Sequence, residues 1–495
     1  MAAKLWIDVE DLFEYARVNA RPSGIQRLAF EIYKALRSRP GASEYVRFVR
    51  HDPPRDTFRV IPWAEVEALF AELADTGPEP AQIVMPGAIL PHPPSRQLVR
   101  KLVHRLSPAL RTLVIDVMLT QATALSAWGR LLAALARGLV SGLSRPFRKR
   151  GRKAQKQAAP APEYHDAFGR ASSAGDILLV LGSPWSHPDY ARLVRVQRAR
   201  GLKFALLVYD LIPLRHPEWC ERGLVRVFRA WFESIFPLCD HAFAISQATA
   251  ADVMHYAKER GLKLTCPVTP IPIGTSFGAA AGSIPAIRTQ RLPAPGSYAL
   301  IVSTIEARKN HLLLFRVWRR LIEERPIDTI PTLVFAGRIG WLVDDLMRQI
   351  ANTNNLDGKL VIVENPTDAE LLSLYQGCQF TLFPSFFEGW GLPVTESLAL
   401  GKACLTSDRT SLPEAGGDLA RRFDPDNLQD AYRAISEVID DPAGLARWEA
   451  QIQRDFKPIP WSATADALLS TLKHPMAAEE EADVTPLVRS GAGAR

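Results

Sequence analysis

The chain has 495 residues, of which 47% are hydrophobic and 23% charged, so it is too long for one ordinary domain and too apolar for a disordered protein. The net charge of +7 does not indicate a generally basic surface, because residues 145–156 (RPFRKRGRKAQK) hold seven Lys and Arg residues without an acid. The remainder is nearly neutral and the basic run lacks interleaved aromatic residues, which argues against nucleic-acid binding.

The five cysteines are scattered and form no CxxC or Cys/His cluster, so neither a disulfide framework nor a structural zinc site is indicated. The N-terminal sequence MAAKLWIDVEDLF lacks a basic and then apolar leader, and we expect no secretory signal. A cytoplasmic location is therefore expected.

The N-terminal half alternates apolar runs with helical patterns. In residues 25–36 the apolar side chains recur on one helical face, and further helices are expected from about residue 189 onward. The apolar runs are continuous rather than alternating, which is typical of parallel strands buried on both faces. The predicted strands cover residues 5–9, 177–181, 204–208, 242–245 and 267–273.

Residues 125–156 allow two interpretations. Apolar side chains recur at helical spacing from Trp128 to Leu143, and the basic run 145–156 follows them. Such a segment can lie on an anionic membrane surface, or it can be a packed helix followed by a solvated loop. Residues 112–129 are too short and too polar for a membrane span, so no transmembrane helix is expected.

The C-terminal half repeats the alternation after residues 283–297, a stretch rich in proline that we interpret as a linker. Two β/α runs separated by a linker predict an α/β protein with two Rossmann-like, doubly wound parallel-sheet domains facing one another across a cleft. The predicted strands of the second run cover residues 299–303, 332–336, 359–363, 380–383 and 403–406.

Polar motifs follow three of these strands, at the sheet edge where ligands bind. Residues 306–311 (EARKNH) bring Arg308 and Lys309 to a helix entry, where two cations could clamp a diphosphate. Gly337 and Arg338 follow the next strand. After residues 380–383 comes a loop with Glu388, and Glu396 is expected in the first turn of the helix behind it. Carboxylates accept hydrogen bonds from vicinal hydroxyls, so the pair suits a polyhydroxylated ligand with two sugar rings.

These motifs resemble a known family. FPSFFEGWGLPVTESLALGKACLTSD followed by SLPEAGGD is similar to the donor-site signature of the family-4 retaining glycosyltransferases of the GT-B architecture. STIEARKNH, VFAGRIGW and DAELLSLYQGC match the same family upstream. WIDVEDL, SGIQR, LGSPW, YDLIPLRHPEW and AISQATAADV resemble its bacterial members that build surface polysaccharide, and residues 78–165 resemble the family least.

The resemblance implies a role for each matching residue. Glu388 would hold hydroxyls of the transferred sugar, and Glu396 the ribose of the nucleotide. Arg308 and Lys309 would neutralise the diphosphate, because the departing nucleoside diphosphate carries the developing negative charge. Together with Glu388 they are the three residues assigned to catalysis. The further donor-binding residues would be Gly389, Trp390, Gly391, Leu392, Gly337, Arg338 and Thr304. No DxD carboxylate pair stands where a metal-dependent enzyme would need one, so neither a metal nor another cofactor is expected.

Gly24, Asp210 and His216 are predicted to lie on the acceptor side of the cleft. Alternatively, Gly24 only forms a plain strand-to-helix turn, and His216 has a structural role. Tyr209 stands where many relatives carry a sugar-contacting histidine, and Thr304 where some carry a phosphate-binding arginine. These departures put both contacts in doubt. Ser246 is expected to cap a helix.

The resemblance also gives the domain limits. We expect an acceptor-side domain over 1–282 with a basic amphipathic insertion at about 110–160, the linker 283–297, and a nucleotide-sugar-binding domain over 298–457. A last helix over 458–473, anchored by Trp461, would return to the N-terminal domain, and 474–495 would be a disordered tail.

The expected function is transfer of a hexose to a lipid-linked oligosaccharide or polysaccharide precursor. Mannose is the favoured hexose, with GDP-mannose as its donor. A UDP- or dTDP-sugar donor, a sugar-nucleotide epimerase of the same architecture and a catalytically silent membrane-surface scaffold stay open as alternatives. The expected partners are the nucleotide-sugar donor, the glycan acceptor and, through 125–156, an anionic membrane at the inner face of the plasma membrane. The donor, the acceptor linkage and the oligomeric state are not specified by the sequence.

Overall fold

The computed structural model describes residues 3–17, 19, 21–52, 57–74, 167–187, 189–275, 287, 289 and 291–472, all of which belong to one compact unit of the chain. The predictions for the insertion at 110–160, the membrane segment 125–156, part of the linker and the tail 474–495 concern residues outside these ranges. They stay predictions.

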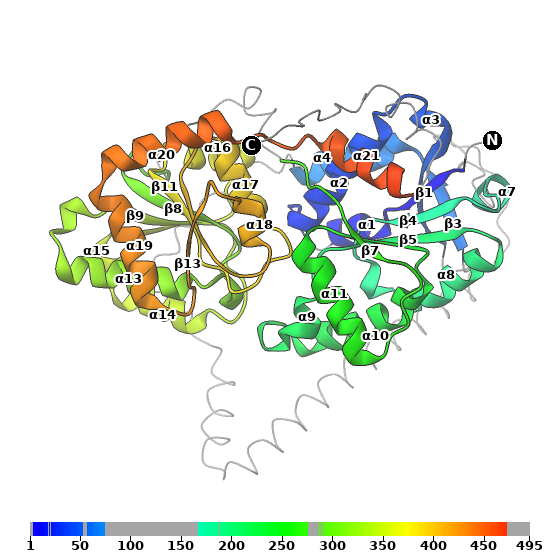
Figure 1. Ribbon diagram of the computed structural model, residues 1–495, viewed down its shortest axis with the longest axis horizontal. Helices are drawn as coiled ribbons and strands as arrows, with labels where there is room; N and C mark the ends of the chain where they lie inside the picture. The colour runs from blue at the N-terminus through cyan, green and yellow to red at the C-terminus, as the bar shows by residue number, and fades with distance from the viewer. Residues whose placement is uncertain are drawn as a thin grey trace, which may run out of the picture. The chain divides into compact units, whose positions relative to one another are not determined.

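The N-terminal half is built on a sheet with strand order β3-β2-β1-β4-β5-β6-β7 among the described residues (Figure 1). Every neighbouring pair is parallel except β2 and β3, which are antiparallel. The order of β3 through β6 is that of a Rossmann fold. The strands are β1 (Leu5–Asp8), β2 (Val46–Asp52), β3 (Thr57–Ile61), β4 (Ile177–Val180), β5 (Lys203–Val208), β6 (His241–Ala244) and β7 (Val268–Pro270).

Both faces of this sheet are covered. Leu5 and Ile7 of β1 pack into one hydrophobic core and Trp6 into the other, as the alternation of side chains along a strand requires. Helix α2 contributes to the first core, and α8 and α10 to the second. The helices are α1 (Glu10–Ala16), α2 (Gly24–Arg37), α3 (Ala42–Tyr45), α4 (Trp63–Ala74), α7 (Ala167–Ala171), α8 (Tyr190–Ala199), α9 (Ile212–Arg215), α10 (Arg222–Ile235) and α11 (Gln247–Arg260).

The C-terminal half holds a second sheet of order β10-β9-β8-β11-β12-β13, parallel throughout among the described residues. This order reverses between β8 and β11, as in the first sheet it reverses between β1 and β4. The predicted fold class of two doubly wound, Rossmann-like domains is therefore confirmed. The strands are β8 (Tyr298–Val302), β9 (Thr332–Ala336), β10 (Leu360–Val363), β11 (Phe380–Phe383), β12 (Cys404–Ser407) and β13 (Arg421–Phe423).

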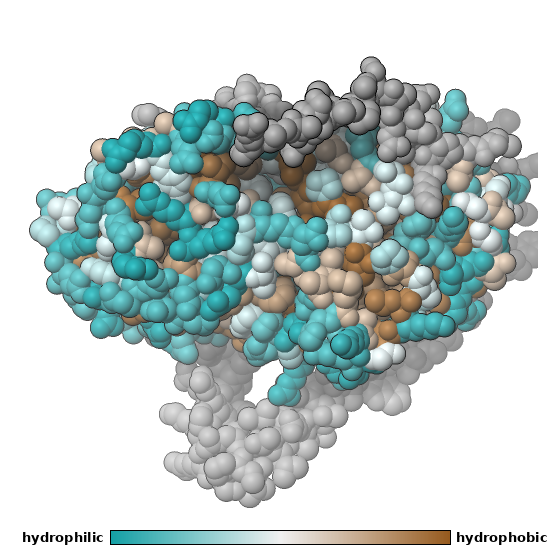
Figure 2. All heavy atoms as spheres, in the orientation of Figure 1, coloured by the Kyte–Doolittle hydropathy of each residue, from teal (hydrophilic) through white to brown (hydrophobic). Residues whose placement is uncertain are grey.

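Helices also cover both faces of the second sheet. Ala299 and Ile301 of β8 pack into one core, and Tyr298 and Leu300 into the other. Hydrophilic side chains dominate the visible surface over α13, α15, α19 and α20 (Figure 2). The helices are α13 (His311–Glu324), α14 (Asp344–Asn352), α15 (Asn354–Asp357), α16 (Asp368–Gly377), α17 (Leu392–Ala399), α18 (Leu412–Gly416), α19 (Leu428–Asp440), α20 (Pro442–Asp455) and α21 (Trp461–Thr471).

The carboxylates of the WIDVEDL motif join β1 to its neighbours. Asp8 accepts hydrogen bonds from the His51 Nε2 at 2.7 Å and from the Tyr190 hydroxyl at 2.6 Å. Burial opposes the charge of Asp8, but His51 and the hydrogen bonds lower its pKa below the ordinary value. Glu10 forms a buried two-point ion pair with Arg50, at 2.7 and 3.0 Å. These acids fix β1 beside β2.

Helix α21 packs against α2 in the N-terminal half. The Trp461 ring lies directly on the backbone of Gly274, where a Cβ atom would clash with it. The Thr464 hydroxyl donates to the Pro272 carbonyl oxygen at 2.8 Å. Only glycine permits this close approach of a ring to the chain.

We expect Trp461→Ala to lower the free energy of unfolding by about 2 kcal/mol, because it removes a large, partly buried apolar side chain. Urea unfolding followed by near-ultraviolet circular dichroism measures the change. Trp341→Ala is the matched control, since Trp341 is 46% exposed. Equal effects of the two substitutions would contradict the anchoring role of Trp461.

Candidate functional site

The candidate site lies where the second sheet reverses its strand order. β8 leads into a short 3₁₀ turn at Ala307–Lys309 and then into α13, while β11 leads through the loop 384–391 into α17. Ligands bind at such switch points because the loops after the two strands diverge to opposite faces of the sheet. The sequence motifs EARKNH and FFEGWG therefore meet at one place.

Three predicted side chains form an ion cluster there. Glu388 Oε2 lies 2.9 Å from Arg308 Nη1, and Glu388 Oε1 lies 2.5 Å from Lys309 Nζ. Arg308 Nη2 also donates to Glu306 Oε1 at 2.6 Å. The side chains of Arg308, Lys309 and Glu388 are only 14%, 16% and 13% exposed. The structure thus brings together the three residues predicted to act in catalysis.

The charges in this cluster support one another. Burial alone would raise the pKa of Glu388, but Arg308 and Lys309 outweigh it and hold that pKa at about 2. Burial likewise opposes the charge of Arg308, whose pKa is nevertheless raised by Glu388, Glu306 and Asp210. Glu388 is therefore ionised at neutral pH, and its two ion pairs hold Arg308 and Lys309 in place.

The loop after β11 is fixed by residues that the sequence did not single out. The Glu388 N–H donates to the Thr410 hydroxyl at 2.9 Å. The buried Ser411 hydroxyl reaches the carbonyl oxygens of Glu388 at 2.9 Å and Trp390 at 2.8 Å. Hydroxyl side chains directly after β12 were the available signal, because the carboxyl end of that strand borders the same loop.

Asn310 holds the two motifs together from the side of β8. Its φ of 57° lies in the left-handed region, which asparagine tolerates better than most residues. Its side-chain amide donates to the Pro384 carbonyl oxygen at 3.2 Å and to that of Pro425 at 3.0 Å. The Phe386 N–H donates to the Arg308 carbonyl oxygen at 3.0 Å.

Gly389 lies against the N-terminal half. A Cβ atom at this position would clash with the Tyr209 carbonyl oxygen, so only glycine fits. The Thr249 hydroxyl lies 3.3 Å from the Tyr209 carbonyl oxygen and 3.2 Å from that of Gly389. Ser246 caps α11 by accepting from the Thr249 N–H at 2.9 Å, as predicted.

Asp210 and His216 lie beside the ion cluster. Arg308, Lys309 and Glu388 all act on the charge of Asp210, whose pKa is raised chiefly by burial. The His216 ring stacks on Trp219 at 4.3 Å and contacts the Phe387 ring at 5.1 Å. Tyr209, in contrast, donates its hydroxyl to the Leu181 carbonyl oxygen at 2.5 Å inside the N-terminal half. The Tyr209 hydroxyl therefore has a backbone partner within that half.

Gly391 and Leu392 form the entry to α17. Gly391 has φ of 113°, a conformation open to glycine, and Leu392 is the first helical residue. Pro393 is in the first turn, where its missing N–H is not needed for a helical hydrogen bond. The Trp390 ring packs against the cores of both halves, and its buried Nε1 has no hydrogen-bond partner among the described residues.

Glu396 is not in the first turn of α17, contrary to our prediction. The helix begins at Leu392, so its first turn ends at Thr395 and contains no acid. Glu396 accepts a hydrogen bond from the Tyr375 hydroxyl at 3.0 Å. Its pKa is raised to about 7, because burial disfavours the carboxylate more strongly than Tyr375 and Arg27 favour it.

The remaining donor-side residues surround the ends of β8 and β9. A side chain at Gly337, φ 155°, would clash with the Ser303 carbonyl oxygen. Thr304 lies against Gly340, and the Arg338 carbonyl oxygen accepts from the Ile305 N–H at 2.8 Å. The Arg338 charge lowers the pKa of Tyr15, although burial raises it overall. Arg338 thus lies within electrostatic reach of the N-terminal half.

Gly24 is the first residue of α2 and is exposed, with open space where a Cβ atom would stand. Sterics therefore do not require glycine there. Nearby, Arg27 forms a two-point ion pair with Asp368 of α16, at 2.7 and 2.9 Å. The start of α2 is thereby tied to the C-terminal half.

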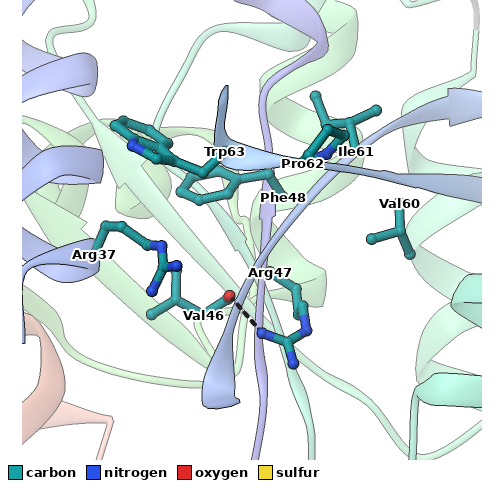
Figure 3. Close-up of a pocket in the computed structure, with 8 residues that line it drawn as sticks. All are labelled: Arg37, Val46, Arg47, Phe48, Val60, Ile61, Pro62 and Trp63. Carbon is teal, nitrogen blue, oxygen red and sulfur yellow. Dashed lines mark hydrogen bonds between the residues drawn. The ribbon is translucent and has the colours of Figure 1, made fainter. Parts of the chain in front are cut away.

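One pocket lies away from this chemistry. It has a volume of about 350 Å³ and is lined by Arg37, by the start of β2, by the end of β3 and by Trp63 (Figure 3). Because Leu5 of β1 pairs with Val46 of β2, this pocket lies at the amino ends of the parallel strands. Ligand sites of doubly wound sheets lie at the opposite edge, so this pocket is not assigned to the candidate site.

Neither a metal-binding cluster nor a membrane-spanning helix is found within the described ranges. In that part of the chain, no group of three or more His, Cys, Asp or Glu side chains is arranged to hold a metal ion. None of the helices there is long and apolar enough to cross a membrane.

The raised pKa of Glu396 predicts a pH-dependent stability. The folded state binds this proton more tightly than the unfolded state, so between about pH 4.5 and 7 this group's contribution to the free energy of unfolding falls as pH rises. Asp11, whose burial also raises its pKa to about 7, acts in the same window. Urea unfolding of the wild type and Glu396→Gln from pH 5 to 7.5 should give a difference that changes with pH. A constant difference would contradict the raised pKa.

The comparisons with known proteins agree with this geometry. Residues 286–455 match the model of the glycosyl transferases group 1 family. The chain is 27% identical over 320 residues to the serotype-specific mannosyltransferase WbdA of Escherichia coli, covering 63% of this chain and 38% of WbdA. It is 30% identical over 240 residues to the O-antigen chain mannosyltransferase B of Escherichia coli, covering 47% of this chain and 60% of that protein. The chain thus spans less than two thirds of each of these relatives.

Solved structures with partial similarity include HepE of Anabaena in complex with UDP and glucose, at 15% identity and a TM-score of 0.45, covering 60% of this chain and 77% of HepE. A glycosyltransferase from Rickettsia africae has 15% identity and a TM-score of 0.44, covering 62% of this chain and 77% of that one. At these scores the fold assignment rests on the strand order above. By its family match, the chain contains, at residues 286–455, a domain of the glycosyl transferases group 1 family.

Proposed function

We propose that the protein is a retaining glycosyltransferase, of family 4, that transfers a hexose from a nucleoside-diphosphate sugar to a glycan acceptor. The observation that carries this proposal is the ion cluster of Arg308, Lys309 and Glu388 at the switch point of a glycosyl transferases group 1 domain. Two cations and a carboxylate at one sheet edge support it, because a sugar diphosphate needs both kinds of group.

Each member of the cluster has a distinct task. Arg308 and Lys309 neutralise the diphosphate and stabilise the negative charge that develops on it as the glycosidic bond breaks. The diphosphate takes over these cations from Glu388, which is then free to accept hydrogen bonds from hydroxyls of the transferred sugar. Gly389, Trp390, Gly391 and Leu392 keep the loop close to the ligand. No protein nucleophile is assigned, because the leaving phosphate assists deprotonation of the acceptor hydroxyl on the same face.

The other donor contacts are assigned from the positions of their residues. Glu396 holds the ribose hydroxyls, and its Tyr375 partner orients it. Thr304, Gly337 and Arg338 line the donor side at the ends of β8 and β9. The cations take the role that a metal has in other glycosyltransferases, so we propose catalysis without a metal. Asp210, His216 and Gly24 form the acceptor side.

We further propose GDP-mannose as the donor and a lipid-linked oligosaccharide or polysaccharide precursor as the acceptor. Two Escherichia coli relatives bear the name of mannosyltransferase, and one of them is named for the O-antigen chain. Acceptors of this kind are membrane-bound, which suits a protein that works at the inner face of the plasma membrane. The basic run 145–156 is the segment proposed to contact anionic lipid.

Nucleotide-sugar binding tests the donor assignment. In a thermal-shift panel with GDP, UDP, dTDP and their sugars, all with EDTA, GDP and GDP-mannose should raise the melting temperature. A ligand at a hundred times its dissociation constant stabilises the fold by about 2.7 kcal/mol. A shift with UDP or dTDP ligands alone would mean that the donor is not GDP-mannose. A shift that appears only when the panel is repeated with Mg²⁺ in place of EDTA would overturn metal independence. No shift in either panel would favour a catalytically silent scaffold. Glycan transfer, followed by mass spectrometry, separates a transferase from an epimerase.

Removing the charge of Glu388 should separate binding from transfer. In Glu388→Gln the cations no longer have a competing carboxylate, so GDP should bind about fivefold more tightly, an increase of about 1 kcal/mol. Transfer should fall about 100-fold or more, because the contact to the sugar hydroxyls is weakened in the transition state. Isothermal titration and a transfer assay measure the two effects.

Glu437→Gln, an exposed position of α19, is the matched control and should change neither quantity. Circular dichroism verifies that each variant is folded. Weaker GDP binding by folded Glu388→Gln would contradict the proposed exchange of partners.

A further inference from the structure

A small cavity lies in the N-terminal half, at the carboxyl end of β5. Its volume is about 70 Å³, and its walls come from the LGSPW and YDLIPL motifs together with α10. Gly182, Tyr209 and Asp210 line it near the strand ends, and Trp185 and Trp231 also line it. The cavity therefore lies at the sheet edge where ligands of this fold bind.

Three aromatic rings make up the apolar wall. The Trp185 ring centre lies 5.5 Å from that of Phe228 and 6.1 Å from that of Trp231, and Phe228 and Trp231 are 5.6 Å apart. Aromatic faces bind the C–H faces of sugar rings, because these rings carry apolar surface between their hydroxyls.

The cavity is open to the surface. Phe228 and Trp231 are buried, but Ile25, Trp185 and Leu224 in its walls are partly exposed. An internal packing defect would have buried residues on every side. A ligand group can therefore enter without unfolding the half.

The carboxylate of Asp210 lines the cavity. Asp210 Oδ1 accepts from the Ile212 N–H at 3.0 Å, which orients the side chain. Asp210 Oδ2 has no hydrogen-bond partner among the described residues and the side chain is partly exposed. It is available to accept a hydrogen bond from a ligand hydroxyl.

The cavity adjoins the ion cluster. Asp210 lies within the electrostatic influence of Arg308, Lys309 and Glu388. Tyr209, another lining residue, contacts Gly389 through its carbonyl oxygen, and Gly389 follows Glu388 directly. A group held in the cavity would thus lie next to the sugar held by Glu388.

We propose that this cavity binds one edge of a pyranose ring of the acceptor glycan, with Trp185 against its apolar face and Asp210 accepting a hydrogen bond from one of its hydroxyls. The inference rests on the proposed transferase function and names an acceptor contact for it. Pockets for whole ligands of drug size measure about 300–1,000 Å³. At about 70 Å³ this cavity takes one edge of a ring, and the rest of the acceptor stays outside.

The test is binding of methyl α-D-mannopyranoside, methyl α-D-glucopyranoside and methyl α-D-galactopyranoside to the full chain with saturating nucleotide, by saturation-transfer NMR titration. At least one should bind to the wild type. Trp185→Ala should weaken that glycoside about fivefold or more, because it removes the stacking surface. Leu224→Trp, which fills the cavity from a partly exposed position without emptying the core, should also weaken it at least fivefold.

Trp63→Ala is the matched control, since Trp63 lines the unrelated pocket of Figure 3 and should leave glycoside binding unchanged. No binding of any glycoside to the wild type, or unaltered binding in both cavity variants, would overturn the inference. Nucleotide binding measured on the same samples keeps the two proposals apart. If nucleotide binds and the cavity variants bind the glycoside as the wild type does, only the proposed acceptor contact is wrong. If no nucleotide binds, the transferase proposal itself is wrong.

Discussion

The candidate site depends on one carboxylate held between two cations. Glu388 neutralises Arg308 and Lys309 in a nearly buried position, where two unpaired cations would be costly. A buried ion cluster adds little net stability compared with apolar packing, so its position at a switch point points to function. The carboxylate contacts both cations and keeps this charged cluster assembled.

The surrounding residues fix the position of this cluster. Thr410 and Ser411 fix the loop from the side of β12, and Asn310 fixes it from the side of β8. Glycine at 389 lets the same loop touch the chain at Tyr209, so the position of Glu388 is set by both halves of the protein. A further contact joins them at α11, where Glu414 of α18 accepts from the Gln247 N–H at 3.0 Å. The two halves are thereby joined by backbone contacts beside the ion cluster.

Much of this arrangement could be predicted from the sequence, because continuous apolar runs mark parallel strands and place the motifs after them. Arg308, Lys309 and Glu388 were predicted as one site on that basis. The strands β2, β3 and β13 were missed, since charged residues interrupt VRFVRHD and TFRVI, and RRF is very short. Glu396 was placed one turn too early because helix starts depend on local hydrogen bonds at Gly391. The roles of Thr410, Ser411 and the cavity beside Asp210 arise from contacts between distant segments, which a linear pattern does not contain.

A crystal structure with a bound nucleoside diphosphate sugar would test the proposed exchange of partners at Glu388. We expect phosphate oxygens within about 3 Å of Arg308 and Lys309, with Glu388 turned from the cations to hydroxyls of the sugar. Glu388 still paired with both cations, and the diphosphate bound elsewhere, would contradict the proposed exchange.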